Sequence, residues 1–293
     1  MSCFHPAKAF LLASGGISFV ERGDIIRDIE VPCGRCIGCR LDRARDWTTR
    51  LIHEASLHKP NWFATLTYDD QHLPNPPSLD YRDYQLFMKR ARKHYGPFRF
   101  FMCGEYGDQT RRPHYHAILF GLPLDDLARW GGKDTAPTFT SPTLTKIWGK
   151  GMIVLGQVNP QTAGYVARYN LKKVNGDRAE AHYRWVDPET GDSHQLVPEF
   201  CNMSRKPGIG ADWYKKFHGD CHNHDFIIRD GSKTPVPRYY DKLGERSGLY
   251  EVDVIKQART VRAKLKQSDN TPERLKARET VAKARSKLST RNL

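Results

Sequence analysis

The sequence predicts an α+β fold in which an antiparallel sheet of about five strands is flanked by helices. Three observations carry this prediction. Short segments rich in aromatic and β-branched residues are typical of strands. They alternate with longer segments whose apolar residues recur at helical spacing. Two of the strand segments, residues 98–105 and 115–120, are separated by the polar, turn-rich GDQTRRP, which favours an antiparallel hairpin.

The strands are placed by their composition. Residues 62–68, WFATLTY, form the first strand candidate, and the two hairpin strands follow. Residues 122–150 are an insertion interrupted by glycine and proline, and residues 152–158 are the fourth candidate. Beyond Val174 the pattern weakens into polar loops and short elements, so further strands are not located there.

The helices are placed by their periodicity. The longest runs from Arg40 to His58, and a second amphipathic helix ends near Gly96. A short helix is expected at residues 144–148 and a last one at about residues 162–173. The resulting order is βαββ(α)βα.

Composition divides the chain into four regions. Residues 1–40 are rich in glycine and cysteine, and we expect this segment to be irregular. Residues 41–175 contain the predicted sheet and helices and form the core. Residues 176–250 are an accessory region, and residues 251–293 are a basic tail that is helix-prone apart from Pro272.

The charge of the chain favours a polyanionic partner. The formal net charge is +14, and Lys256 to Leu293 contribute +9 of it, through twelve Lys or Arg against three acidic residues. Basic proteins gain affinity for nucleic acids by releasing counterions from the phosphates. No segment approaches the roughly 20 apolar residues of a membrane helix. The N-terminal MSCFHPAKAF lacks the features of a secretory signal.

A candidate metal site surrounds residues 105–116. His114 and His116 alternate along a predicted strand, so they project from the same face. Glu105 lies across the predicted hairpin and adds a carboxylate. This mixed nitrogen and oxygen set suits Mn²⁺ or Mg²⁺ as a Lewis acid on a phosphate, and it also suits catalytic zinc. Arg111 and Arg112 precede the histidines as candidate phosphate contacts, although they could equally be loop charges.

A candidate nucleophile lies on the last predicted helix. Tyr165, Tyr169 and Lys172 have the spacing i, i+4, i+7 and share one helical face. Aromatic residues at this spacing more often pack in a core, but Arg168 and Lys173 add charge to this segment. Because a phenol has a pKa of about 10, it needs nearby cations or a metal-polarised phosphate to act as a nucleophile.

Cysteines suggest a second metal site. The chain has seven cysteines, an odd number that argues against a closed set of disulfides. Cys33, Cys36 and Cys39 have a spacing typical of reduced, metal-binding thiols in a cytosolic protein. The segment CHNH at residues 221–224 is left unassigned, and so are the other cysteines outside the N-terminal region.

These segments together resemble the HUH endonuclease superfamily. More narrowly, they are similar to the two-tyrosine rolling-circle replication initiators of microviruses, especially the gokushovirus group of single-stranded DNA phages. FATLTY at residues 63–68, RPHYHAILFG at 112–121 and GYVARYNLKK at 164–173 occur in the order of the family's motifs. PCGRCIGCR, SRKPGIG at 204–210 and PRYYDK also resemble this group. One departure is Tyr115, which stands where the metal motif usually has an aliphatic residue.

The resemblance implies an HUH/RRM-like catalytic core over residues 41–175. It implies that Glu105, His114 and His116 bind Mg²⁺ or Mn²⁺, that Tyr165 and Tyr169 are alternating nucleophiles, and that Lys172 stabilises the transition state. The implied reaction is site-specific nicking and joining of a single-stranded DNA origin through a 5′-phosphotyrosine. Host DNA polymerase and a host helicase are the implied partners, in the host cytoplasm. Arg111, Arg112, Arg168 and Lys173 are the expected DNA contacts.

The phage group also implies Cys3 as the fourth ligand of a structural zinc with Cys33, Cys36 and Cys39. Other functions remain open at this point. A relaxase usually has its tyrosine before the metal motif, and a single-strand transposase usually has one tyrosine. A non-catalytic, zinc-containing nucleic-acid-binding protein would explain the charge and the cysteines. It leaves the order of the histidine and tyrosine motifs to coincidence.

Overall fold

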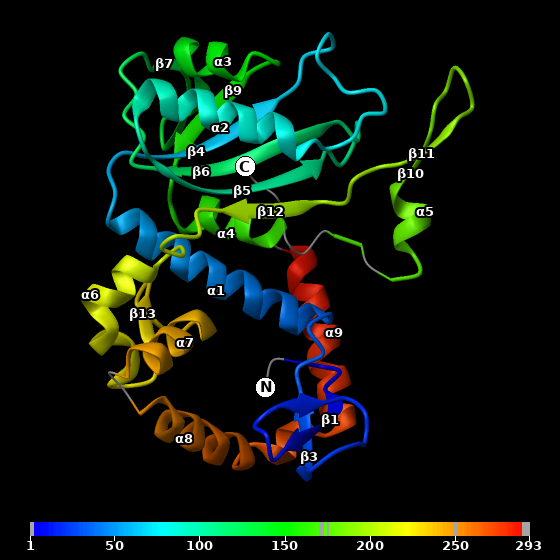
Figure 1. The fold of residues 1–293 in the computed structure, drawn as a ribbon, viewed down its shortest axis with the longest axis vertical. Helices are drawn as coiled ribbons and strands as arrows, with labels where there is room; N and C mark the ends of the chain where they lie inside the picture. The colour runs from blue at the N-terminus through cyan, green and yellow to red at the C-terminus, as the bar shows by residue number, and fades with distance from the viewer. Residues whose placement is uncertain (1–2, 170–172, 175, 249–250, 289–293) are drawn as a thin grey trace. The chain divides into compact units, whose positions relative to one another are not determined.

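The computed structural model describes residues 3–288 apart from 170–172, 175 and 249–250. The chain forms two compact units (Figure 1). The terminal unit comprises residues 1–45 and 244–293, and the central unit comprises residues 46–243. Each unit is described by itself.

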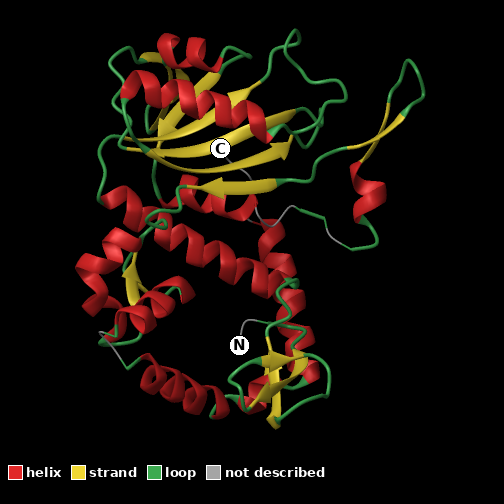
Figure 2. Cartoon of the chain, viewed as in Figure 1, coloured by secondary structure: helices red, strands yellow, loops and turns green. Residues whose placement is uncertain are grey.

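The central unit is built on one antiparallel sheet with seven strands, so the predicted number of about five is wrong (Figure 2). Two of the additional strands lie in the insertion predicted without strands, and one lies in the weakly patterned region beyond Val174. They occupy both margins of the sheet. An edge strand pairs on one side only and is often short, so its sequence signal is weak. In spatial order the strands are β12 (Phe200–Met203), β5 (Arg99–Tyr106), β6 (Pro113–Phe120), β4 (Asn61–Thr67), β9 (Ile153–Gln157), β8 (Ala136–Thr140) and β7 (Ala128–Lys133).

Helices cover both faces of this sheet. Figure 1 shows α2 (Tyr81–Tyr95) and α3 (Pro142–Trp148) on one face and α4 (Pro160–Tyr169) on the other. The central-unit part of α1 (Ile37–Ser56) also packs on the α4 face, where the rings of Trp47 and Phe101 lie 4.9 Å apart. The four predicted helices thus correspond to these four, with ends shifted by a few residues.

The main hydrophobic core lies between the sheet and α2. Tyr84, Phe87, Met88 and Ala91 form the buried face of this helix at the predicted spacing. The helix begins where the Asp80 side chain accepts a hydrogen bond from the backbone N–H of Arg82. Burying a large apolar side chain stabilises the fold by about 1.5–3 kcal/mol, so this face largely determines where the helix packs.

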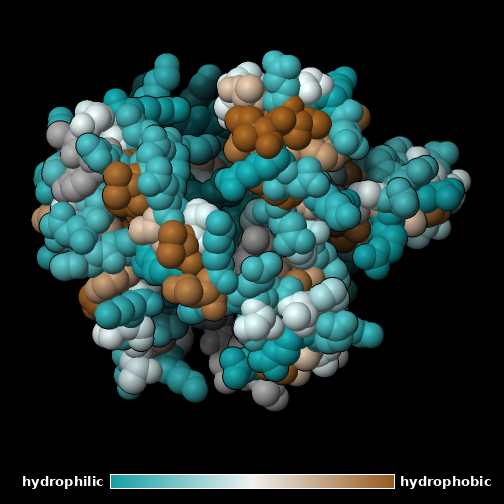
Figure 3. Space-filling view, turned by 90° about the horizontal axis from the view of Figure 1, so that it is seen from below, coloured by the Kyte–Doolittle hydropathy of each residue, from teal (hydrophilic) through white to brown (hydrophobic). Residues whose placement is uncertain are grey.

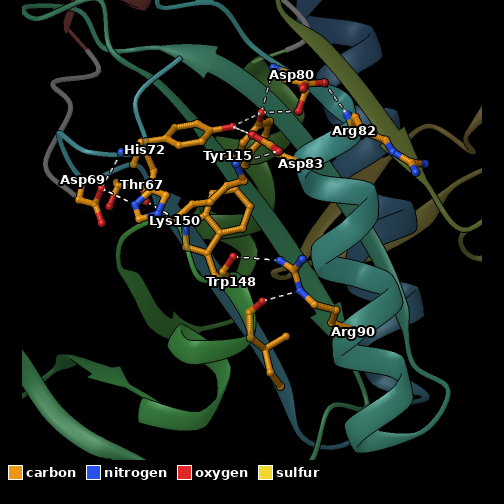
Figure 4. Close-up of polar contacts among 12 residues, drawn as sticks. Thr67, Asp69, His72, Asp80, Arg82, Asp83, Arg90, Tyr115, Trp148 and Lys150 are labelled. Carbon is orange, nitrogen blue, oxygen red and sulfur yellow. Dashed lines mark hydrogen bonds and ion pairs between the residues drawn. The ribbon is translucent and has the colours of Figure 1, made fainter. Parts of the chain in front are cut away.

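Tyr115 points into this core, away from the two histidines that flank it (Figure 4). Its hydroxyl donates to the backbone oxygen of Asp80 at 2.6 Å and accepts from the N–H of Asp80 at 3.1 Å. Nearby, the hydroxyl of Tyr68 donates to Asp83, which also pairs with Lys150 at 3.2 Å. A tyrosine therefore fits the middle of the histidine motif, because its ring is buried and its hydroxyl links β6 to the start of α2.

The segment SRKPGIG is held in place by buried side chains of the same unit. Glu54 is fully buried and accepts a hydrogen bond from the N–H of Gly210 at 2.7 Å, while Arg50 donates to the carbonyl of Ile209 at 3.0 Å. A Cβ atom at Gly208 would lie 2.3 Å from the Tyr239 hydroxyl, so glycine is required there. The segment leads into α6 (Ala211–His222), which packs with α7 (Arg238–Ser247) and the hairpin of β13 (Ile227–Arg229) and β14 (Ser232–Thr234).

Between α4 and β12 the chain forms α5 (Ala179–Tyr183) and a hairpin of β10 (Arg184–Val186) and β11 (Ser193–Gln195). Tyr183 is buried against the main core, and its hydroxyl bonds to Glu199. This region follows the last residues of the nucleophile motif, and it is joined to the core by that side chain.

The terminal unit contains a second sheet, which corrects the prediction that residues 1–40 are irregular. β1 (Ala7–Leu12) pairs with β2 (Ile17–Ser18) and β3 (Ile25–Val31) in the antiparallel order β2-β1-β3. Charged residues alternate with apolar ones in β3, and glycines interrupt the segment, so its strand signal is weak.

The basic tail is folded in this unit. It forms α8 (Val252–Lys264), a 3₁₀ turn (Gln267–Asn270) and α9 (Pro272–Leu288). Pro272 begins α9, a position that tolerates proline because the first N–H groups of a helix have no partner within it. Val252 and Leu275 are buried, and His5 lies 2.9 Å from Glu279. Among the described helices, none is long and apolar enough to cross a membrane.

Candidate active site

Three predicted metal ligands converge on one face of the central sheet. Glu105 at the end of β5 pairs directly with His114 on β6, and His116 follows two residues later on the same face. Oε1 of Glu105 lies 2.7 Å from Nε2 of His114 and 3.1 Å from Nε2 of His116. One ligand atom from each residue lies within 4.8 Å of the others. The antiparallel register therefore brings the three donors together across the loop.

The other ring nitrogens are oriented by neighbouring groups. Nδ1 of His114 lies 3.2 Å from the backbone oxygen of Arg112, which can only accept a hydrogen bond. Nδ1 of His116 lies 2.9 Å from the hydroxyl of Thr65, its cross-strand partner on β4. When Nδ1 carries the proton, the lone pair of Nε2 is free to bind a metal.

Glu105 supplies the negative charge. Its side chain is buried, which opposes ionisation, but hydrogen bonds from His114 and His116 outweigh burial and lower the pKa of the carboxyl to about 2. A carboxylate beside two imidazole nitrogens fits a divalent cation such as Mn²⁺, Mg²⁺ or Zn²⁺.

Tyr165 lies beside this cluster. Its ring is T-shaped against His116, with centroids 5.2 Å apart, and also against Phe63 at 6.0 Å. Phe63 in turn stacks on His116 at 5.4 Å. The structure thus brings Tyr165 to the histidine cluster. Tyr169 ends α4, but its side chain lies outside the described part of the chain, and so does Lys172.

The four predicted DNA contacts have different surroundings. Arg111 donates to the carbonyl of His182 and lies over the ring of Tyr106, and Arg112 pairs with Asp70 at 2.6 Å. Both arginines therefore hold neighbouring chain segments. Two further cations follow the nucleophile helix face: the side chain of Arg168 is exposed, and that of Lys173 is half-buried.

Phe63 and Thr65 are the site residues whose roles sequence reasoning missed. The signal was present, because both belong to FATLTY and alternate along one strand. Their contacts with His116 depend on β4 lying next to β6, a pairing that no local pattern specifies. The first motif therefore supports the histidine on two sides, through a ring and a hydroxyl.

We expect Thr65→Val to weaken binding of Mn²⁺ by about 10- to 100-fold, because the imidazole of His116 loses the acceptor that orients it. Calorimetric titration with Mn²⁺ measures the change. Thr65→Ser keeps the hydroxyl and should restore most of the affinity. Thr67→Val is the matched control, because the hydroxyl of Thr67 donates to Met152 and not to a histidine. Unchanged affinity in Thr65→Val would remove this role.

The predicted zinc ligands also converge, in the terminal unit. The sulfur atoms of Cys3, Cys33, Cys36 and Cys39 lie within 4.8 Å of one another, and all four are free thiols. Backbone N–H groups donate to three of them: that of Cys33 to Cys3, that of Phe4 to Cys36, and that of Cys36 to Cys33. Burial opposes ionisation of Cys36, but hydrogen bonds to its sulfur lower its pKa to about 6. Four sulfurs stabilised as thiolates fit a tetrahedral zinc ion.

The CHNH segment has a different environment. Cys221 is buried in the small core around α6 and α7, and Nε2 of His222 lies 2.9 Å from the hydroxyl of Tyr214. Within residues 3–288, leaving out the undescribed positions, the only groups of at least three potential ligands that converge are the two described above. This segment therefore packs the accessory region.

Comparison with known proteins gives a consistent assignment. The family of the replication-associated protein ORF2 matches residues 61–174, which contain the histidine cluster and α4. The chain is 33% identical over 253 residues to the replication-associated protein VP4 of Bdellovibrio phage phiMH2K, covering 82% of this chain and 76% of that protein. It is 31% identical over 293 residues to the replication-associated protein ORF2 of Spiroplasma virus 4, covering 90% and 87%. It is also 35% identical over 223 residues to the replication-associated protein ORF4 of Chlamydia phage 1, covering 73% and 53%. No solved structure matches the chain significantly.

Proposed function

The chain belongs to the family of phage replication-associated proteins, and we propose that it initiates rolling-circle replication by nicking and rejoining single-stranded origin DNA. The observation that carries this proposal is the convergence of Glu105, His114 and His116 beside Tyr165. A nucleic-acid-binding protein without catalysis has no need of a buried carboxylate and two oriented imidazoles next to a tyrosine.

The three ligands determine what the site supplies. A divalent ion held by Glu105, His114 and His116 acts as a Lewis acid on the scissile phosphate, and we propose Mg²⁺ or Mn²⁺. Thr65 and the carbonyl of Arg112 keep the imidazoles in the orientation that presents Nε2. Phe63 packs against both His116 and Tyr165, so it maintains the distance between the ligand and the tyrosine.

We propose Tyr165 and Tyr169 as nucleophiles of a transesterification. The phenolic oxygen forms a bond to phosphorus, the bond from phosphorus to the 3′-oxygen breaks, and the phenolic proton is transferred to that oxygen. The products are a 5′-phosphotyrosine and a free 3′-hydroxyl. Reversal by another 3′-hydroxyl joins the DNA and releases the tyrosine, so the phosphodiester energy is conserved. We propose Lys172 and Arg168 as nearby cations that stabilise the added negative charge.

The same proposal defines the partners and the second metal. The free 3′-hydroxyl would be extended by a host DNA polymerase, with a host helicase separating the strands in the host cytoplasm. We propose a structural zinc at Cys3, Cys33, Cys36 and Cys39, where it would hold the start of α1 to the N-terminal residues.

The test is covalent capture of a labelled single-stranded origin oligonucleotide in the presence of Mn²⁺. The wild-type chain should form a denaturation-resistant adduct, and mass spectrometry should locate the nucleotide on the peptide that contains Tyr165 and Tyr169. Each single Tyr→Phe variant should form less adduct, and the double variant should form none.

Tyr81→Phe is the matched control, because Tyr81 lies on α2 at the opposite face of the sheet. It should retain the adduct. Adduct formation by the Tyr165→Phe/Tyr169→Phe double variant would refute the nucleophile assignment. Absence of any adduct with the wild-type chain, despite binding of the oligonucleotide, would favour the non-catalytic alternative.

A further inference from the structure

Positive charge is concentrated in the terminal unit. Residues 1–45 and 244–293 carry twenty Lys and Arg against eleven Asp and Glu, a formal charge of +9. The central unit carries twenty-seven against twenty-two, a formal charge of +5, in about twice as many residues. The unit without the candidate active site therefore has most of the attraction for a polyanion.

The cations of this unit are displayed on folded helices. Buried Val252 and Leu275 hold α8 and α9 within the unit. Exposed cations extend along these helices and the turn between them: Lys264, Lys266, Lys276 and Arg285. Among the residues described, none of these four takes part in an ion pair. Their charges are therefore available to an external ligand, unlike that of Lys256, which pairs with Glu245 and Asp253.

The chemistry of this surface favours DNA over a lipid membrane. A helix that lies in a membrane interface needs a continuous apolar face, often with aromatic residues. In α9, Leu275 is turned inward, and Val281 is the exposed large apolar residue of its described side chains. On the face of the molecule in Figure 3, hydrophilic side chains predominate and the hydrophobic ones form separate patches. Phosphate contacts from Lys and Arg need no such face.

We propose that the terminal unit is a DNA-backbone-binding module, which holds the DNA through phosphates without reading its sequence. This inference rests on the proposed function and deepens it. The central unit would cut the strand at low intrinsic affinity, and the terminal unit would keep the enzyme on the same molecule between the nicking and joining steps.

The test uses the full chain with Lys264, Lys266, Lys276 and Arg285 all changed to Gln. Binding to a labelled duplex and to a single strand of unrelated sequence is measured at several salt concentrations, without added Mn²⁺. We expect at least a tenfold loss of affinity at low salt. The slope of log K against log salt should become shallower by about 0.9 for each duplex phosphate that is no longer neutralised, and by about 0.7 on single strands.

A matched variant removes four exposed lysines from the central unit: Lys89, Lys93, Lys133 and Lys146, each changed to Gln. It has the same total charge as the first variant and should bind within about threefold of wild type. Equal losses in both variants would show a general effect of net charge and overturn the module. Unchanged binding in the terminal-unit variant would overturn it as well.

Two further measurements separate the causes. Circular dichroism and thermal unfolding should match wild type, and cleavage of a saturating origin oligonucleotide should be retained. Loss of binding to anionic phospholipid vesicles with unchanged DNA binding would overturn the proposal in favour of a membrane partner. If the wild-type chain binds DNA with this salt dependence but never forms the tyrosine adduct, the module stands and the proposed catalysis fails.

Discussion

Glu105→Gln is expected to lower the affinity for Mn²⁺ and the rate of adduct formation by roughly 100-fold or more. Glu105 is the one anionic donor among the three ligands, and its charge is maintained in a buried position by the two histidines. Glutamine has nearly the same shape but cannot offset the charge of a bound cation, so the loss measures charge and not packing.

Calorimetric titration and covalent capture should fall together in this variant. The matched control is Asp70→Asn, which neutralises a nearby exposed carboxylate that pairs with Arg112 and contributes no ligand. It should keep both metal binding and adduct formation close to wild type. A Glu105→Gln chain with normal metal affinity would mean that the histidines bind the ion without the carboxylate.

Cys36→Ser is expected to abolish zinc binding and to unfold the N-terminal segment. Structural zinc contributes about 10–16 kcal/mol of apparent binding free energy in small zinc modules, which is far more than the short β1–β3 sheet can provide alone. The wild-type chain should therefore contain about one zinc per chain by metal analysis. Its terminal unit should become sensitive to proteases when a strong chelator is added.

Cys201→Ser provides the control, since Cys201 is a half-buried thiol on β12 and is not a member of the four-sulfur group. It should retain zinc and resistance to proteolysis. If the wild-type chain purified without chelators has no zinc, or if Cys36→Ser retains the metal, the structural-zinc proposal is wrong. Adduct formation by the central unit is a separate readout, because its ligands do not include these thiols.

The sequence was most informative where function needs particular residue types at close spacing. The alternation of His114 and His116 places both on one face of any strand, and the spacing of Cys33, Cys36 and Cys39 requires little folding to bring the thiols near each other. The helices were also predictable, because the apolar faces of α1 and α2 are encoded by local periodicity. The family resemblance rests on these same local segments.

Tertiary structure determined which distant segments meet. The distance from Glu105 to His114 depended on a loop whose register no local pattern specifies, and the antiparallel pairing of β5 and β6 resolved it. The support of His116 by Thr65 and Phe63 required β4 to lie beside β6. Edge strands such as β7 and β12 were missed because pairing on one side leaves little constraint on their composition.

The histidine and tyrosine motifs were thus determined by the sequence itself, because the geometry of one strand or one helix fixes the spacing of neighbouring side chains. Their assembly into a site was decided only by the fold. Contacts such as that between Tyr165 and His116 join segments far apart in the chain, and they form when the packed sheet and helices bring those segments together. The same holds for the basic tail, whose helices share a unit with the N-terminal cysteines through contacts such as His5 with Glu279.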